Sequence, residues 1–145
     1  DARAALDEGP DIVNDISAGT LDKDLLPTVA KLGVPYVLMH MKGDPQTMQS
    51  NPSYETVTLE VFGQLSFAIK NLQRQGIHDI IVDPGFGFGK TITHNFQLLR
   101  ELHFFQQLGK PVLVGLSRKG TVYKTLNTIP EKPLMEQPCC TRLPL

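Results

Sequence analysis

The sequence predicts an α/β fold built on a parallel sheet, and two observations support this prediction. Short apolar runs rich in β-branched residues alternate with longer segments that have helical periodicity. Polar residues follow directly after the apolar runs, where strands would end. Such alternation favours parallel strands joined by right-handed crossovers. Two arrangements satisfy it, a closed β/α barrel and an open doubly wound sheet.

The first third of the chain predicts two strands separated by a helix. Residues 1–6 have the character of a helix end, and a β-branched run at 11–16 predicts the first strand. A helix is predicted over 25–32, because its proline lies in the first turn and a glycine follows its last residue. The continuous apolar run at 35–41 predicts a strand buried on both faces, and the stretch 42–53 predicts a loop.

The middle of the chain repeats the alternation twice more. Residues 54–75 predict the longest helix, since their apolar side chains recur at three- and four-residue spacings. A third strand is predicted at 79–83, followed by a glycine-rich loop at 84–90. An amphipathic helix is predicted over 95–108, and an apolar run at 111–116 predicts the fourth strand.

The segment Asp-Pro-Gly-Phe-Gly-Phe-Gly-Lys-Thr at residues 83–91 is the most informative motif. Its alternating glycines let the backbone approach a ligand closely, and the phenylalanines between them can stack on a planar ring. A nucleotide phosphate loop is disfavoured, because that motif needs four residues between its glycines and Gly85 to Gly89 encloses three. A purely structural turn explains the glycines but not the accompanying Asp, Phe and Lys.

Polar residues at the ends of separate predicted strands are candidates for one site. Asp83 can accept two hydrogen bonds from a flat N–H/NH₂ edge such as that of a pterin, and Asn14 can read the same ring. Arg118 and Lys119 offer positive charge, and Ser117 can bind an anion or cap a helix. Alone, Asp83 is as well explained by a helix cap or a surface carboxylate, Asn14 by an Asx turn after the strand, and Lys119 by a solvated surface position. Their shared placement favours an enzyme site.

The histidines give no metal signature. His40 ends an apolar strand, but no second His or Cys stands at ligand spacing, so a buried or supporting role is predicted for it. His78, His94 and His103 fall in predicted loops or on helix surfaces.

Composition excludes several classes of protein. The 145 residues are 41% hydrophobic and 20% charged, with a formal net charge of −1, which is typical of a globular domain. The absence of a basic run argues against a dedicated nucleic-acid binder, and no apolar run approaches the ~18 residues of a membrane-spanning helix. Cys139 and Cys140 are adjacent and give no disulfide framework, so a cytoplasmic location is predicted.

Five segments together resemble dihydropteroate synthase, the pterin-binding enzyme family of folate synthesis. They are residues 12–16, 38–41, 42–49, 83–90 and 115–119, and their order and spacing agree over roughly residues 1–134. The resemblance implies a TIM-type (β/α)8 barrel, of which this chain would hold about strands four to seven with their helices. It implies condensation of 7,8-dihydropterin pyrophosphate with 4-aminobenzoate, which gives 7,8-dihydropteroate and pyrophosphate.

The resemblance also assigns roles to residues. It implies that Asp83 and Lys119 are catalytic, and that Ser117 and Arg118 lie by the 4-aminobenzoate. The pterin would be bound by Asn14, Met39, Asp83, Phe88, Gly115 and Lys119. The family uses Mg²⁺, whose ligand segment would lie outside this chain, so no metal ligand is predicted here. The full-length parent is expected to form a homodimer.

Departures from the family pattern bear on activity. A complete barrel needs about 200–250 residues, and the family's first strands and its final Arg and His have no counterpart here. We therefore expect the 145-residue chain to be inactive by itself. Two alternatives stay open, a pterin-binding methyltetrahydrofolate methyltransferase, whose pterin pocket is similar, and an inert truncated product.

The last residues do not continue the barrel pattern. We expect a pterin-binding domain over residues 1–134 and a disordered, aberrant tail over 135–145. Codons that are compatible with this tail, read two nucleotides later, can spell Gly-Thr-Thr-Val-Leu-His-Thr-Leu-Ala-Leu, which resembles the family's next helix. A one-nucleotide deletion after Leu134 is the predicted cause.

Overall fold

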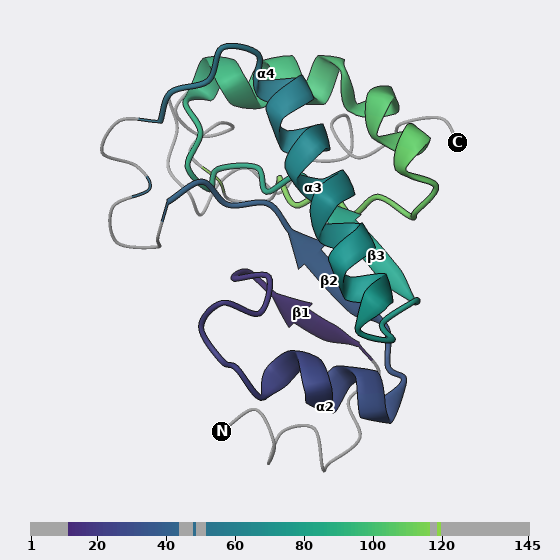
Figure 1. The fold of residues 1–145 in the computed structure, drawn as a ribbon. Helices are drawn as coiled ribbons and strands as arrows, with labels where there is room; N and C mark the ends of the chain where they lie inside the picture. The colour runs from purple at the N-terminus through teal and green to yellow at the C-terminus, as the bar shows by residue number, and fades with distance from the viewer. Residues whose placement is uncertain (1–11, 44–47, 49–51, 117–118, 120–145) are drawn as a thin grey trace.

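A computed structural model of the chain describes residues 12–43, 48, 52–116 and 119, which form a parallel sheet with helices packed on one side (Figure 1). The first predicted helix end and the predicted tail lie outside the described residues. The elements are β1 (Val13–Asp15), α2 (Leu25–Leu32), β2 (Tyr36–Met39), α3 (Val57–Arg74), β3 (Ile80–Asp83), α4 (Ile92–Arg100) and the 3₁₀ helix η1 (Leu102–Leu108).

The three strands are parallel and run in the order β1-β2-β3, which confirms the predicted α/β class and sheet type. In the register of the sheet, Asn14 pairs with Val37, and Val37 pairs with Ile81. Met39 pairs with Asp83, so the last residues of β2 and β3 lie side by side. The carboxyl ends of neighbouring strands therefore meet at one edge of the sheet.

The helices cover one face of this sheet. Alternate strand residues, among them Tyr36, Leu38 and Val82, belong to a single buried cluster with side chains from α3, α4 and η1. Because successive side chains of a strand point to opposite faces, the intervening residues point away from this cluster. Met39 and Asp83 are such intervening residues, so they share the other face of the sheet with Asn14.

Two predicted elements differ from the observed ones. The fourth strand, predicted at 111–116, is reduced to a single parallel bridge between Val112 and Val82, flanked by two backbone hydrogen bonds to Val82. The helix predicted over 95–108 is instead α4 followed by η1. Its second half is a 3₁₀ helix that buries Leu102 and Phe105, whose three-residue spacing matches the repeat of that helix.

Helix α4 begins earlier than predicted because Thr91 caps it. The Thr91 hydroxyl accepts a hydrogen bond from the His94 backbone N–H at 3.1 Å, and the His94 ring accepts one from the Thr91 N–H at 3.2 Å. This reciprocal pair satisfies two backbone donors that the helix itself leaves without partners.

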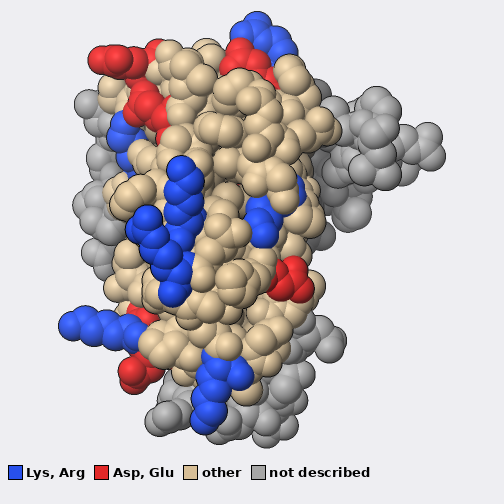
Figure 2. Space-filling model, turned by 45° about the vertical axis from the view of Figure 1, so that its right-hand side comes forward, with Lys and Arg blue, Asp and Glu red and all other residues tan. Residues whose placement is uncertain are grey.

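The surface carries little net charge. Figure 2 shows basic and acidic side chains scattered over one largely uncharged face, in keeping with the formal net charge of −1. Among the described helices, none has both the length and the apolar character needed to cross a bilayer.

A buried carboxylate fixes the turn that follows β1. The Asp15 side chain accepts hydrogen bonds from the Ser17 N–H at 2.8 Å, the Ser17 hydroxyl at 2.6 Å and the Gly19 N–H at 2.6 Å. It also accepts one from the Tyr36 hydroxyl of β2 at 2.7 Å. Burial raises the pKa of Asp15, but these hydrogen bonds outweigh that effect and hold the pKa below its usual value.

Replacing Tyr36 by Phe is expected to lower the free energy of unfolding by about 1–2 kcal/mol near neutral pH, because a buried carboxylate loses a donor. The folded pKa of Asp15 lies below its ordinary value of 3.8. Its stabilising effect is therefore complete above that value and is lost as pH falls through the folded pKa. Urea unfolding from neutral pH down to about pH 3 measures the loss and its decline.

Tyr54→Phe is the matched control for this experiment. Its hydroxyl donates to the uncharged Gly89 carbonyl at 2.9 Å, so its loss should not follow the titration of Asp15. Equal pH dependence in the two variants would show that the Tyr36 contact does not stabilise an ionised carboxylate.

Candidate functional site

The floor of the candidate site is the face of the sheet that the helices leave uncovered. Asp83, which is 6% exposed, lies beside Met39 at the carboxyl end of the sheet. Asn14 is exposed on β1, two strands away from Asp83. A strand spacing of about 4.8 Å and a rise of about 3.3 Å per residue place the Cα atoms of Asn14 and Asp83 roughly 12 Å apart. Their side chains thus bracket a space on one surface.

The loop after β3 packs directly on the backbone that follows β2. Gly85 has a φ of +71°, and a Cβ there would overlap the His40 carbonyl oxygen. Gly89 has a φ of +58°, and its Cβ would lie 2.5 Å from the Lys42 carbonyl oxygen. Only glycine permits both the positive φ and the close approach at these positions. The sequence predicts that these glycines let the backbone approach a ligand closely. In the structure, Gly85 and Gly89 approach the protein's own backbone at His40 and Lys42.

Asp83 joins the strand to this loop. Its Oδ1 accepts a hydrogen bond from the Gly85 N–H at 2.7 Å, which makes a local turn. The carboxyl is nevertheless buried and not a surface group. Burial raises the pKa of Asp83 above its usual value, and the Gly85 N–H and the charges of Lys119 and Lys90 oppose that rise.

Lys90 lies inside the loop, where its side chain is 3% exposed. Its Nζ donates to the carbonyl oxygens of Gly85 at 2.9 Å and Phe88 at 3.0 Å, and it lies 3.0 Å from His40 Nδ1. Burial lowers the pKa of Lys90 to about 7, although the charge of Asp83 opposes this shift. No local sequence pattern indicates this position's role, since His40 stands 50 residues away along the chain.

His40 is 4% exposed and takes the supporting position predicted for it. Burial and then the charge of Lys90 lower the pKa of His40 to about 3, so its ring is neutral at physiological pH. A ring that accepts from Lys90 at Nδ1 carries its proton on Nε2, an assignment that rests on the hydrogen-bond pattern. The ring thus serves as a neutral acceptor at the end of β2.

Lys119 also contacts the loop after β3. Its Nζ donates to the Phe86 carbonyl oxygen at 2.5 Å and lies 4.8 Å from the centre of the Phe88 ring. A Cβ at Gly115 would lie 3.6 Å from this Nζ, so Gly115 also borders the lysine. Burial lowers the pKa of Lys119, and the charge of Asp83 opposes this shift.

The structure brings most of the predicted site residues together and leaves others apart. Asp83, Phe88, Gly115 and Lys119 gather around the loop, with Met39 as the strand neighbour of Asp83. Asn14 lies on the same face of the sheet as Met39 and Asp83, but two strands away from Asp83. Ser117 and Arg118 lie outside the described residues. The remaining histidines are His78 and His103, which are exposed, and His94, which caps α4.

The described residues do not suit a magnesium ion. They contain no group of three or more His, Cys, Asp or Glu side chains placed to hold a metal. The buried carboxyl of Asp83 is instead flanked by two ammonium groups, whereas Mg²⁺ prefers several oxygen ligands. No step of the chemistry is assigned to a metal on these residues.

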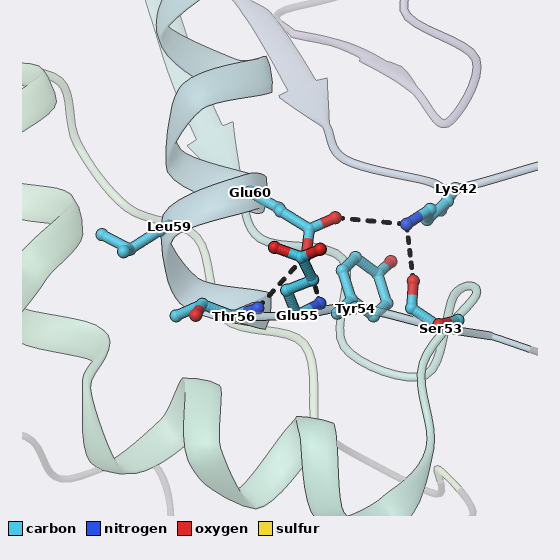
Figure 3. Close-up of a pocket in the computed structure, with 7 residues that line it drawn as sticks. All are labelled: Lys42, Ser53, Tyr54, Glu55, Thr56, Leu59 and Glu60. Carbon is cyan, nitrogen blue, oxygen red and sulfur yellow. Dashed lines mark hydrogen bonds and ion pairs between the residues drawn. The ribbon is translucent and has the colours of Figure 1, made fainter.

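A separate open hollow of about 530 Å³ lies at the start of α3 (Figure 3). Lys42 Nζ donates to the Ser53 carbonyl at 2.5 Å and pairs with Glu60 Oε2 at 3.2 Å, while Glu60 Oε1 accepts from the Glu55 N–H at 2.7 Å and the Thr56 N–H at 3.2 Å. These groups satisfy one another and cap the helix, so the hollow is a structural feature.

Comparison with known proteins defines the class to which this fold and site belong. The chain matches the sequence pattern of the pterin binding enzymes over residues 1–140. It therefore belongs to the pterin binding enzyme family.

Within that family, the chain is similar to dihydropteroate synthases. It is 44% identical over 127 residues to the enzyme of Haemophilus influenzae, a match that covers 86% of this chain and 46% of the relative. It is 39% identical over 134 residues to that of Escherichia coli K12, covering 91% and 47%. The chain thus spans about half the length of the curated relatives it matches.

Solved structures give the same result. A Yersinia pestis dihydropteroate synthase with a sulfonamide drug complex superposes with a TM-score of 0.91 at 34% identity, covering 96% of this chain and 51% of that chain. The Thermus thermophilus enzyme in complex with 4-aminobenzoate gives 0.89 at 37% identity, covering 96% and 55%. The Xanthomonas albilineans enzyme in complex with 7,8-dihydropteroate gives 0.85 at 37%, covering 96% and 51%. The described sheet therefore matches part of these enzymes' fold.

Replacing Gly85 by Ala is expected to destabilise the protein by at least about 3 kcal/mol, because the new Cβ meets backbone and the positive φ is strained. Gly33→Ala is the control, since Gly33 has a similar φ of +65° but nothing within 4 Å of its Cβ position. Strain alone should cost that variant about 1 kcal/mol. If urea unfolding showed the same loss of stability in Gly85→Ala and Gly33→Ala, the tight packing of the loop on His40 would be contradicted.

Proposed function

We propose that this chain forms the pterin-binding part of a dihydropteroate synthase, over about strands four to seven of an eight-stranded β/α barrel. The whole protein would condense 7,8-dihydropterin pyrophosphate with 4-aminobenzoate and release pyrophosphate. Family membership supports this proposal, as do the relatives' names and the ligands named for the solved structures. The observation that carries it is the buried carboxyl of Asp83 at the end of β3.

Asp83 is suited to hold the pterin. An ionised carboxylate accepts two parallel hydrogen bonds from an N–H/NH₂ edge, and a low-dielectric setting strengthens them. Asn14 would hydrogen-bond the other end of the ring system across the roughly 12 Å that separates the two Cα atoms. Met39 would contribute an apolar surface beside Asp83. Phe88, with Lys119 over its ring, and Gly115 would complete the slot.

The same groups favour the reaction. When the bond between the pterin methylene carbon and the pyrophosphate oxygen breaks, the electron pair leaves with pyrophosphate and the pterin becomes cationic. A fixed carboxylate at Asp83 stabilises that positive charge in the transition state. The amine of 4-aminobenzoate then forms the new C–N bond and loses a proton. Lys119 would contact the pterin and help to exclude water.

Ser117 and Arg118 are proposed to lie beside the 4-aminobenzoate, where Arg118 would suit its carboxylate. Mg²⁺ would be held by a part of the enzyme other than the described residues. A cytoplasmic location and a homodimer are also proposed for the whole protein. No observation on the described residues favours the methyltransferase alternative.

Turnover tests the proposed reaction. A protein that carries this chain within a complete barrel is expected to release pyrophosphate only when dihydropterin pyrophosphate and 4-aminobenzoate are both present. The 145-residue chain by itself is expected to give no product. An enzyme-coupled assay for pyrophosphate measures turnover by the complete barrel and by the 145-residue chain. Release that is independent of 4-aminobenzoate would contradict the assigned reaction.

Asp83→Asn is expected to weaken binding of a pterin by about 10- to 100-fold, because the amide cannot accept two hydrogen bonds from the same edge and loses a charge-assisted contact. Fluorescence titration with 6-hydroxymethylpterin measures the dissociation constant. Asp79→Asn is the matched control, since Asp79 is exposed just before the same strand. An equal effect of the two changes would argue against Asp83 as the pterin-binding carboxylate.

A further inference from the structure

We propose that Lys90 is a positioning residue of this site: its side-chain nitrogen, which contacts His40 and two carbonyls of the loop, holds the loop 84–90 in the conformation in which Asp83 and Phe88 face the pterin. This inference rests on the proposed function and extends it. Lys90 Nζ is directed at groups within the protein, the Gly85 and Phe88 carbonyls and His40 Nδ1, so it acts through these neighbours and not by touching the substrate.

The geometry of the Lys90 contacts supports this role. The Gly85 and Phe88 carbonyls both point at Nζ, at 2.9 and 3.0 Å, so one ammonium group bridges the two ends of the turn. The third partner, His40 Nδ1 at 3.0 Å, belongs to the segment after β2. Lys90 therefore ties the loop after one strand to the end of the neighbouring strand.

The loop also closes tightly around this group. The Cβ position of Gly85 lies 3.4 Å from Lys90 Nζ and overlaps the His40 carbonyl oxygen. Both groups therefore lie on the side of Gly85 that a Cβ would occupy, and Lys90 Nζ also lies 3.5 Å from the His40 carbonyl oxygen. Loss of the ammonium group would leave the carbonyls of Gly85 and Phe88 buried without that donor, which costs free energy unless the loop moves. Any movement displaces Phe88.

Charge is the second means by which Lys90 acts. The charged groups that face Asp83 from the described residues are Lys90 and Lys119, while His40, which faces Lys90, is neutral. Both ammonium groups oppose the effect of burial on the carboxyl. Without Lys90, burial would raise the pKa of Asp83 further, and the carboxylate that binds the pterin would protonate at a higher pH.

The test compares wild type with Lys90→Met, which keeps an unbranched side chain of similar length, and Lys90→Gln, which keeps a hydrogen-bond donor. Fluorescence titration with 6-hydroxymethylpterin is carried out over a range of pH on the full chain. Lys90→Met is expected to bind at least about tenfold more weakly near neutral pH, with the acidic loss of binding shifted upward by about half a pH unit or more. Lys90→Gln should bind more tightly than Lys90→Met at neutral pH. It should still lose binding at a higher pH than wild type, because it has no positive charge.

Lys42→Met is the matched control. Lys42 is also a lysine next to the end of β2, but it is partly exposed and pairs with Glu60. Its replacement is expected to change the affinity less than twofold and to leave the pH profile unmoved. Urea unfolding of each variant over the same pH range separates positioning from a merely structural role, because the acidic loss of binding should move at pH values where Lys90→Met is still folded.

Two results would overturn the inference. The first is that Lys90→Met and Lys90→Gln bind the pterin with wild-type affinity and lose binding at the same acidic pH as wild type. The second is unchanged hydrogen exchange at the amides of Gly85 and Phe88 in both variants, because a loop held by Lys90 should exchange faster without it. The exchange measurement needs no ligand. Failure of wild type to bind the pterin at all would instead count against the proposed function.

Discussion

The packing of the loop 84–90 on the end of β2 is the constraint on which the candidate site depends. Gly85 and Gly89 bring the loop backbone into contact with the backbone of His40 and Lys42, where no side chain fits. Contact between two stretches of backbone leaves little freedom, because neither can change rotamer to make room. The position of Asp83 relative to Met39 follows from the sheet, and the position of Phe88 follows from the loop.

Burial and charge oppose each other at Asp83, and the site uses both. A carboxyl away from water forms stronger hydrogen bonds, but burial favours its neutral form, which cannot accept two of them. The ammonium groups of Lys90 and Lys119 restore part of the preference for the ionised form. The ring of His40 beside Lys90 adds no further charge, since its low pKa keeps it neutral. When both lysines are protonated, the cluster therefore carries a net positive charge, which favours the ionised carboxyl of Asp83.

Patterns within a segment predict most of the helices and strands, but they do not predict contacts between residues that are far apart in the sequence. The helix at Leu25–Leu32 is predicted with its observed bounds because its proline and the Gly33 cap are signals within the segment itself. The break between α4 and η1 is not predicted, since the apolar spacing suits either kind of helix. The partnership of Lys90 and His40 could not be predicted, because it depends on how two parallel strands align across 50 residues of chain. Asp83 could be found because it ends a strand.

The outer side of β1 has a consequence for how the described sheet can be extended. Within the described part of the chain, β1 pairs only with β2, so one row of its backbone N–H and C=O groups faces away from the sheet. Such a row is a template for another extended segment. An extended segment of a polypeptide that reached this edge would add a further strand to the sheet through backbone hydrogen bonds alone.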